Sequence, residues 1–324
     1  MTHRIRRSLL ACAAAAVGLL AAPAPAQERF PSRQVTILVG FAPGGGGDIS
    51  ARFIADFLRE RWKVPVVVEN RPGAGATIAA GQLARSRPDG YTVALATTSP
   101  FTVAPNFQSV PYDAAKDFTY LFQFLVSAQP LFVRSDSPHR TWQDFVAWAR
   151  ANPGRLNWST AATNGGPHIA TEAAFRHLGV SGTYVPYKGG ADAITALLGG
   201  QIDALVAAEF PPFVASGQVR LLVESGPDKL PDFPGLPTYK ELGYPLSVPI
   251  FYGIAAPAGV PAEVIAVWEE AAQEMMKTPG FRELMGKLKS TGAYQGHREF
   301  SATLATVQRE MARLIPALGF KRNP

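Results

Sequence analysis

Four consecutive glycines, Gly44 to Gly47, interrupt an apolar run and are followed at once by a helix-like segment. The run before them, "VTILVGF" (35–41), is typical of a buried strand, and "ISARFIADFLRERW" (49–62) has the apolar spacing of a helix. Ordering a glycine inside regular structure costs roughly 0.5–1 kcal/mol more than ordering an alanine. The chain therefore needs bare backbone here, either for a tight turn or for close approach of a bound molecule.

The same succession of strand, small-residue loop and helix recurs along the chain. It is repeated in "VPVVVENRPGAGATIAAGQLAR", in "RLNWSTAATNGGPHIATEAAFRHLG" and in "TYVPYKGGADAITALLGG". Further short strands are expected at 90–97, 130–135 and 250–256, and the part from Pro261 onward is expected to be largely helical. This alternation predicts an α/β fold with parallel strands.

The loops after the strands are candidate anion sites. In open α/β sheets, ligands bind at the carboxyl ends of the strands, where helices present free N–H groups and the positive end of their dipole. No Lys follows Gly44–Gly47 as a phosphate-binding loop requires, and Ile49 stands where a dinucleotide motif needs its third glycine. With phosphate-binding and dinucleotide motifs excluded, a carboxylate is the class of anion that remains. The alternative is that the glycines form a plain tight turn without binding a ligand.

The first 26 residues have the pattern of a secretory signal peptide. Arg4, Arg6 and Arg7 precede a short apolar stretch that ends in Ala24-Pro25-Ala26. We expect cleavage after Ala26 and a periplasmic protein, exported by either the general secretory or the twin-arginine route. A lipoprotein acylated at Cys12 is the alternative, but it would leave almost no apolar stretch before the cut.

Composition excludes several classes of function. Cys12 is the only cysteine, so the mature chain is expected to have no disulfide and no cysteine metal site. The formal charge of +6 falls to +3 once Arg4, Arg6 and Arg7 are removed, and no run of like charge points to nucleic acid. No later stretch is long and apolar enough to span a bilayer, so we expect a soluble mature protein.

Several motifs also follow one another as in a known family. These are "FAPGGGGD", "VVVENRPGAGATIAA", "PDGYTVAL", "VPYD…KDF", "ANPGRLNWST", "YVPYKGG" and "GGQIDA". From about residue 33 to 305 the chain resembles the tripartite tricarboxylate transporter receptors, also called Bug-type periplasmic solute-binding proteins. The resemblance implies a receptor that closes on a small carboxylate and delivers it to a membrane transporter.

The resemblance also implies the fold and its division. We expect a fold like that of type II periplasmic binding proteins, with two α/β domains and the ligand cleft between them. One domain should comprise 27–128 and 253–324, and the other 129–252, with the two crossings as the hinge. No cofactor and no metal are expected, and the protein should act as a monomer.

Ligand-binding residues are carried over from the family by motif. In the family, backbone amides and ordered water hold the inner carboxylate. The positions that match are Phe41, Gly44, Gly45, Gly46, Thr98 and Ser99 in the first domain and Ala162, Thr163, Asn164, Gly165 and His168 in the second. Asp48, Tyr187 and Glu209 are added as candidates from their place in the same loops.

Alternative roles stay open for some of these residues. Asp48 either caps a helix at 49 or contacts the ligand. His168 is either a ligand contact or a structural residue at the start of a helix. Tyr187 and Lys188 either reach the far end of the ligand or pack at the rim, and Asn70-Arg71 is expected to brace a loop.

Two segments depart from the family pattern near the expected cleft mouth. Ala207 and Ala208 replace small polar or acidic residues, with Glu209 just beyond, and Tyr252 replaces a common tryptophan. A more apolar wall predicts an aromatic or a longer aliphatic acid as ligand.

Other functions were weighed against the residues. His168, Glu172 and His177 share one expected helix, but His177 would point away from the other two, and a metal site needs three convergent ligands. A hydrolase would need a base within reach of a serine such as Ser99, and no hydrolase sequence motif is present. A receptor that presents its ligand to a membrane sensor kinase is the remaining alternative.

Overall fold

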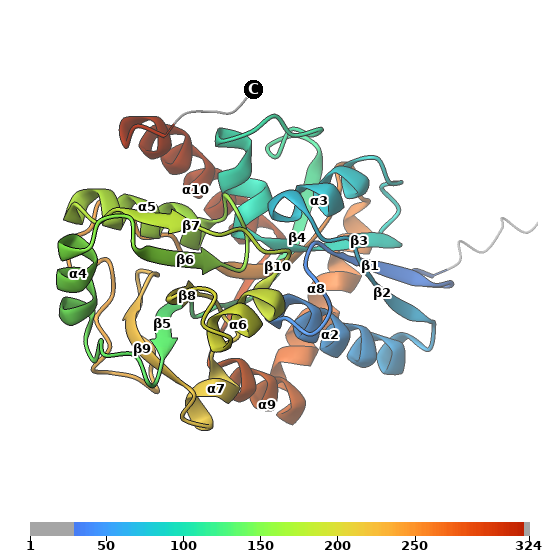
Figure 1. The fold of residues 1–324 in the computed structure, drawn as a ribbon. Helices are drawn as coiled ribbons and strands as arrows, with labels where there is room; N and C mark the ends of the chain where they lie inside the picture. The colour runs from blue at the N-terminus through green and yellow to red at the C-terminus, as the bar shows by residue number, and fades with distance from the viewer. Residues whose placement is uncertain (1–28, 321–324) are drawn as a thin grey trace, which may run out of the picture. The chain divides into compact units, whose positions relative to one another are not determined.

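The computed structural model describes residues 29–320, and the elements of this region alternate between strands and helices (Figure 1). The predicted signal peptide, its cleavage site after Ala26 and Cys12 lie outside the described residues. The first part of the chain forms β1 (Val35–Val39), α2 (Gly46–Trp62), β2 (Val66–Asn70), η1 (Ala74–Ala76), α3 (Thr77–Ala84), β3 (Thr92–Thr97), η2 (Ser99–Val103), η3 (Ala104–Asn106) and β4 (Phe118–Val126). The middle forms β5 (Pro130–Arg134), α4 (Trp142–Ala151), β6 (Leu156–Thr160), α5 (Gly166–Leu178), β7 (Gly182–Tyr184), α6 (Gly190–Leu198), β8 (Ala204–Val206), α7 (Pro211–Ala215) and β9 (Val219–Glu224). The last part forms β10 (Phe251–Pro257), α8 (Ala262–Lys277), α9 (Pro279–Leu288), β11 (Thr291–Gly296) and α10 (His297–Ala317).

Two sheets organise these elements. The first has six strands in the order β11-β4-β10-β3-β1-β2, and the second has five in the order β7-β6-β8-β5-β9. In each sheet three strands run parallel, namely β3-β1-β2 and β7-β6-β8, and the others are added antiparallel. The predicted α/β fold with two sheets is therefore confirmed.

Helices cover both faces of the first sheet. On one face, Phe101 packs edge-on against Phe118, and Phe300 of α10 joins the same apolar cluster as Leu83 of α3. On the other face, Trp268 of α8 is fully buried and packs near Phe122 of β4. Figure 1 shows α3 above this sheet and α2 below it. Strands of a sheet that helices cover on both faces are usually buried, with apolar residues on both sides.

The second sheet is covered in the same way. Trp142 of α4 stacks on Phe175 of α5, and Phe175 packs edge-on against Trp158 of β6. On the opposite face, Leu197 of α6 and Phe210 join a second apolar cluster. In Figure 1, α5 lies above this sheet and α6 and α7 lie below it.

The chain passes between the sheets twice, once between β4 and β5 and once between β9 and β10. The two crossings are bonded to each other, because Ser225 donates through both its N–H and its Oγ to the carbonyl of Gln129. Ser127 likewise donates its N–H to the carbonyl of Ile250 at 2.7 Å. The domain boundaries expected from the sequence stay a prediction.

Several local expectations can be compared with the structure. Thr141 and Asp144 form the predicted capping box at the start of α4. The helix expected at 49–62 begins earlier, at Gly46, because the last two glycines adopt helical geometry. β4 and β11 were not expected, and both are antiparallel additions that depend on pairing with distant strands. None of the helices within residues 29–320 has the length and apolar character needed to cross a membrane.

Gly253 in the central strand β10 provides a test of this packing. A Cβ added there would lie 2.4 Å from the carbonyl oxygen of Phe122 and 2.6 Å from the ring of Phe300. Gly253→Ala is therefore expected to lower the free energy of unfolding by about 2 kcal/mol, through overpacking. Gly286→Ala in helix α9 is the control, since its added Cβ meets no atom within 4 Å. Denaturant unfolding should show a loss for Gly253→Ala alone, and equal stability of the two variants would contradict this packing.

Candidate functional site

Glycines lie at the N-termini of three helices that follow parallel strands. Gly45, Gly165 and Gly189 are the N-cap residues of α2, α5 and α6, and a glycine has no side chain with which to cap its helix. The first N–H groups of these helices carry the positive end of the helix dipole, and that of Gly46 in α2 donates a long hydrogen bond to Oε1 of Glu209. α2 belongs to the first sheet and α5 and α6 to the second, so each sheet contributes a helix N-terminus that begins at a glycine.

Asp48 braces the loop that carries Gly44–Gly47. Its Oδ2 accepts hydrogen bonds from the N–H of Gly44 at 3.0 Å and from Nε of Arg52 at 2.9 Å, and its Oδ1 accepts one from Nδ2 of Asn70 at 2.8 Å. Burial raises the pKa of Asp48, but the hydrogen bonds from Arg52, Gly44 and Asn70 outweigh it and hold the pKa below its ordinary value. The expectation that Asp48 caps a helix at 49 is wrong, because the helix begins at Gly46 and the bonded N–H precedes it.

Asn70 completes this brace, as expected from the sequence. Its Nδ2 also donates to the carbonyl of Phe41 at 3.1 Å, and Arg52 donates to its Oδ1. The end of β2 is thereby tied to the loop after β1, which fixes the glycines in place.

The brace predicts a measurable loss of stability. Asp48→Ala would leave the N–H of Gly44 and the amide of Asn70 without their partner, and should lower the free energy of unfolding by about 2 kcal/mol near neutral pH. Because the pKa of Asp48 is lowered on folding, this contribution is present above the unfolded pKa and disappears as the pH falls. Arg52→Ala, which removes a half-exposed ion pair and an exposed hydrogen bond to Asn70, should cost less than 1 kcal/mol. Denaturant unfolding at pH 7 and pH 3 checks both, and an equal loss in the two variants would rule the brace out.

His168 fixes the corresponding loop of the second sheet. Its Nδ1 accepts a hydrogen bond from the N–H of Asn164 at 2.9 Å, and its ring stacks on Tyr184 with centroids 3.8 Å apart. Burial lowers the pKa of His168 to about 4, so the ring is neutral and can accept this bond. The hydroxyl of Tyr184 in turn lies 3.1 Å from Oγ1 of Thr163. This arrangement supports the structural alternative for His168.

Loops of the two sheets meet at several places. A Cβ added to Gly165 would lie 2.6 Å from Oγ of Ser99, and one added to Gly75 would lie 2.8 Å from the carbonyl oxygen of Thr163. The third contact joins the N–H of Gly46 to Oε1 of Glu209 at 3.4 Å. The contacts at Gly165 and Gly75 require glycine, because the loops approach too closely there for a side chain.

A pocket of about 230 Å³ lies among these loops. It is lined by Gly40, Phe41, Gly73, Ala74, Gly75, Ala76, Ala161, Ala162, Thr163, Tyr187 and Lys188. Of the predicted site residues, it brings together Phe41, Ala162, Thr163 and Tyr187. The stretch 73–76 was not predicted as a lining element, although its position directly after a parallel strand is the signal that identified the other loops.

The remaining predicted residues lie beside this pocket or away from it. Gly44, Gly45, Gly46, Asp48, Ser99, Asn164, Gly165, His168 and Glu209 are not among its lining residues. Thr98 is fully buried, and its Oγ1 donates to the carbonyl of Pro249 and accepts from the N–H of Phe251. The hydroxyl of Thr98 therefore stabilises the second crossing.

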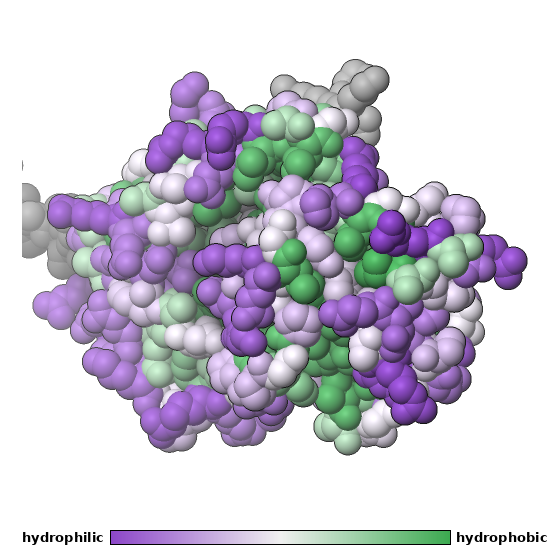
Figure 2. Space-filling view, turned by 90° about the vertical axis from the view of Figure 1, so that its left-hand side faces the viewer, coloured by the Kyte–Doolittle hydropathy of each residue, from purple (hydrophilic) through white to green (hydrophobic). Residues whose placement is uncertain are grey.

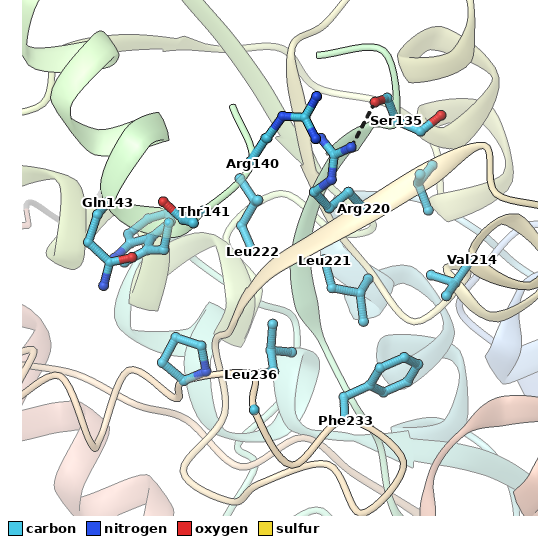
Figure 3. Close-up of a pocket in the computed structure, with 14 residues that line it drawn as sticks. Ser135, Arg140, Thr141, Gln143, Val214, Arg220, Leu221, Leu222, Phe233 and Leu236 are labelled. Atoms are coloured by element: carbon cyan, nitrogen blue, oxygen red, sulfur yellow. Dashed lines mark hydrogen bonds between the residues drawn. The ribbon is translucent and has the colours of Figure 1, made fainter. Parts of the chain in front are cut away.

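A larger hollow of about 770 Å³ lies elsewhere, along β9 and away from the glycine loops (Figure 3). Arg220 at its wall donates to the carbonyls of Ser135, Ser137 and His139, so its guanidinium braces the backbone. Figure 2, which views the side of the molecule where α4 and β9 lie, shows hydrophobic patches separated by hydrophilic residues. The smaller pocket is lined by loops of both sheets that lead into helix N-termini, which makes it the better candidate for an anion.

His168, Glu172 and His177, the side chains considered and rejected as a metal site, do not converge. Glu172 pairs with Arg176, and the ring of His177 packs near Tyr244. Within residues 29–320, no group of three or more His, Cys, Asp or Glu side chains has the geometry to hold a metal ion.

Known structures share this architecture. The periplasmic binding protein BugD is 29% identical, with a TM-score of 0.84 over 91% of this chain and all of that one. Rpa4515 of R. palustris with adipate is 25% identical, with a TM-score of 0.84 and the same coverage. MatC of Rhodopseudomonas palustris with bound malate is 26% identical, with a TM-score of 0.80 over 88% of this chain and all of that one.

Sequence comparison agrees with the structural likeness. A protein of Cupriavidus necator described as "UPF0065 protein in gbd 5'region" is 33% identical over 323 residues, which is 99% of this chain and 98% of that protein. The family model of the "Tripartite tricarboxylate transporter family receptor" matches residues 50–320. The predicted resemblance is confirmed, and the chain belongs to the tripartite tricarboxylate transporter receptor family.

Proposed function

We propose that this protein is a periplasmic receptor that captures a small carboxylate between its two sheets and delivers it to a membrane transporter of the tripartite tricarboxylate type. The observation that carries the proposal is the meeting of loops from both sheets around one small pocket, with the loops at 73–76, 161–163 and 187–188 leading into the N-termini of α3, α5 and α6. Such N-termini favour anions without an arginine clamp. The adipate and malate held by two structural relatives belong to the same chemical class.

A ligand that contacts the loops of both sheets would couple its binding to closure of the cleft between them. A ligand favours the closed state only if its affinity for that state exceeds its affinity for the open one. The pocket is lined by Gly75 from the first sheet's loops and by Thr163 from the second's, so a bound carboxylate would touch both. Capture and release then follow from one opening motion.

A hydrolytic function finds no support in the same loops. Across residues 29–320, Ser99 and His168 share no hydrogen bond, and Nδ1 of His168 is already used by Asn164. A buried histidine with its pKa lowered to about 4 is also a weak general base. We therefore propose a binding protein and not an enzyme.

Location and partners complete the proposal. We propose export by the signal peptide with cleavage after Ala26, action as a monomer, and ligand transfer to transporter membrane subunits. Presentation to a sensor kinase would use the same cleft. Transporter or kinase genes beside the receptor gene would distinguish the two partners.

Thermal unfolding of the mature protein against mono-, di- and tricarboxylates tests the function. The protein should first be refolded to remove any bound ligand. A ligand at 100 times its dissociation constant adds about 2.7 kcal/mol, which should raise the midpoint by several degrees. A rise with one class of carboxylate is expected. No rise with any carboxylate, together with a rise for a neutral solute, would overturn the proposal.

A further inference from the structure

Glu209, in the loop after β8, places a carboxylate among the glycine loops. The residue as a whole is half-buried, but its Oε2 atom is shielded from solvent and accepts no hydrogen bond. Its Oε1 accepts a long hydrogen bond from the N–H of Gly46, and the backbone N–H groups of Glu209 and Ala208 also stabilise the carboxylate. One oxygen of this buried group therefore has no partner, which is rare because such a group costs free energy until it is satisfied.

The surroundings are shaped to receive this carboxylate. A Cβ added to Gly190 would lie 2.1 Å from Cδ of Glu209, and one added to Gly45 would lie 3.1 Å from its Oε1. The carboxylate thus lies between the first turns of α2 and α6, one from each sheet. The glycines leave the space that it fills.

No cation neutralises Glu209 in the described part of the chain. Its hydrogen-bond donors are backbone N–H groups, those of Glu209 itself, Gly46 and Ala208, and the charge of Glu209 also interacts with Tyr252. Burial raises the pKa of Glu209, and these N–H groups offset the effect only in part. A positively charged or N–H-bearing group of a ligand would satisfy the free oxygen and remove this penalty.

A cation lies on the other side of the same pair of loops. Lys188 lines the 230 Å³ pocket, and Gly189, between Lys188 and Gly190, packs against Ala42 with an added Cβ only 3.4 Å from that side chain. The pocket and Glu209 therefore flank one contact between the loops of the two sheets. If the loops separated at this contact, the pocket and Glu209 would form one site, with Lys188 at its positive end and Glu209 at its negative end.

We propose that Glu209 selects carboxylates whose far end carries an ammonium or another N–H donor, and rejects dicarboxylates. The inference rests on the proposed function and deepens it. The ligand's carboxylate lies toward Lys188 and the uncapped helices, and its donor end lies against Oε2 of Glu209. A dicarboxylate would bring a second negative charge against a buried carboxylate that has no cation of its own.

Titration calorimetry with matched pairs of ligands tests this selection. Adipate and 6-aminohexanoate differ only in the group at one end, as do succinate and 4-aminobutyrate. The wild-type protein is expected to bind the amino member of the better-bound pair at least tenfold more tightly. In Glu209→Gln the preference should fall below threefold, because the amide is neutral and can also donate to a carboxylate.

Glu172→Gln is the matched control, since it removes the same charge from an ion pair outside the site. It should keep the wild-type preference, and Glu209→Gln should unfold at a midpoint no lower than wild type. Equal affinity for both members of the pairs in wild type, or an unchanged preference in Glu209→Gln, overturns the inference and leaves the carboxylate receptor intact.

The thermal-unfolding experiment with mono-, di- and tricarboxylates distinguishes failure of this inference from failure of the proposed function. If neither pair binds, the inference is judged on the carboxylate that raises the unfolding midpoint. A ligand without any N–H donor overturns the inference, whereas an amino or amide acid that loses at least tenfold in affinity in Glu209→Gln supports it. If no carboxylate binds, the proposed function and this inference fall together.

Discussion

Glu224→Ala is expected to lower the free energy of unfolding by about 3 kcal/mol, since Glu224 ties the two crossings between the sheets together. Its side chain is buried, and both carboxylate oxygens accept the N–H of Gln129, at 3.0 and 3.1 Å. Oε1 also accepts the N–H of Gly226 at 2.8 Å. Truncation leaves two buried N–H groups without a partner, each costing about 1–3 kcal/mol. Denaturant unfolding at pH 7 measures the loss.

Glu224→Gln removes the ionisable group of Glu224 and keeps nearly the same side-chain shape. Burial raises the pKa of Glu224 to about 8, although the N–H groups of Gly226 and Gln129 lower it. The folded protein therefore holds a proton that the unfolded chain releases near pH 4.5, so the stabilisation is complete below that pH and is lost as the pH rises through 8. Relative to Glu224→Gln, the wild type should lose about 4 kcal/mol between pH 4 and pH 9. Parallel stability curves would mean that the N–H groups hold Glu224 charged throughout.

Gly165→Val is expected to weaken carboxylate binding at least 100-fold while the protein still folds. The backbone of Gly165 is extended, with φ −84° and ψ 170°, so other residues can adopt it. An added Cβ would lie 2.6 Å from Oγ of Ser99 in a loop of the first sheet, and 2.9 Å from the carbonyl of Ala162 in its own loop. The side chain would thus hold the two sheets apart, at a cost to folding of about 1 kcal/mol.

Gly235→Val is the control for this variant, because its added Cβ meets no atom within 4 Å. Titration calorimetry with the carboxylate that shifts wild-type unfolding should show unchanged affinity for Gly235→Val. Wild-type affinity in Gly165→Val would mean that the ligand does not require the loops of both sheets to meet at this point.

The local part of the fold was predictable from the sequence. β1 and β6 are buried parallel strands and β2 is a half-buried one, and each is followed by a loop of small residues. Thr141 caps α4 by pairing with Asp144, three positions further along the chain. Such patterns depend on neighbours along the chain, so periodicity and turn chemistry reveal them. β11 carries no such signal, because its position depends on pairing with β4, far away in sequence.

The roles of individual site residues were harder to predict for the same reason. Asp48 bonds to Asn70, 22 residues away, in place of the helix cap that its position suggested. Thr98 bonds to Pro249, and Glu209 approaches Gly46 across 163 residues. Motifs located these loops, but only the folded chain shows which of their polar atoms already have partners, and that Oε2 of Glu209 has none.

Nuclear magnetic resonance of protein labelled with ¹⁵N at glycine tests the central claim most directly, because glycines are frequent in the loops that are proposed to receive the carboxylate. On titration with a carboxylate that raises the unfolding midpoint, the signals of Gly75, Gly165 and Gly189 should move together and saturate at one dissociation constant. Those of Gly235 and Gly286, outside the loops, should stay in place. Movement confined to the glycines of one sheet, or to glycines outside these loops, would contradict a carboxylate held between the two.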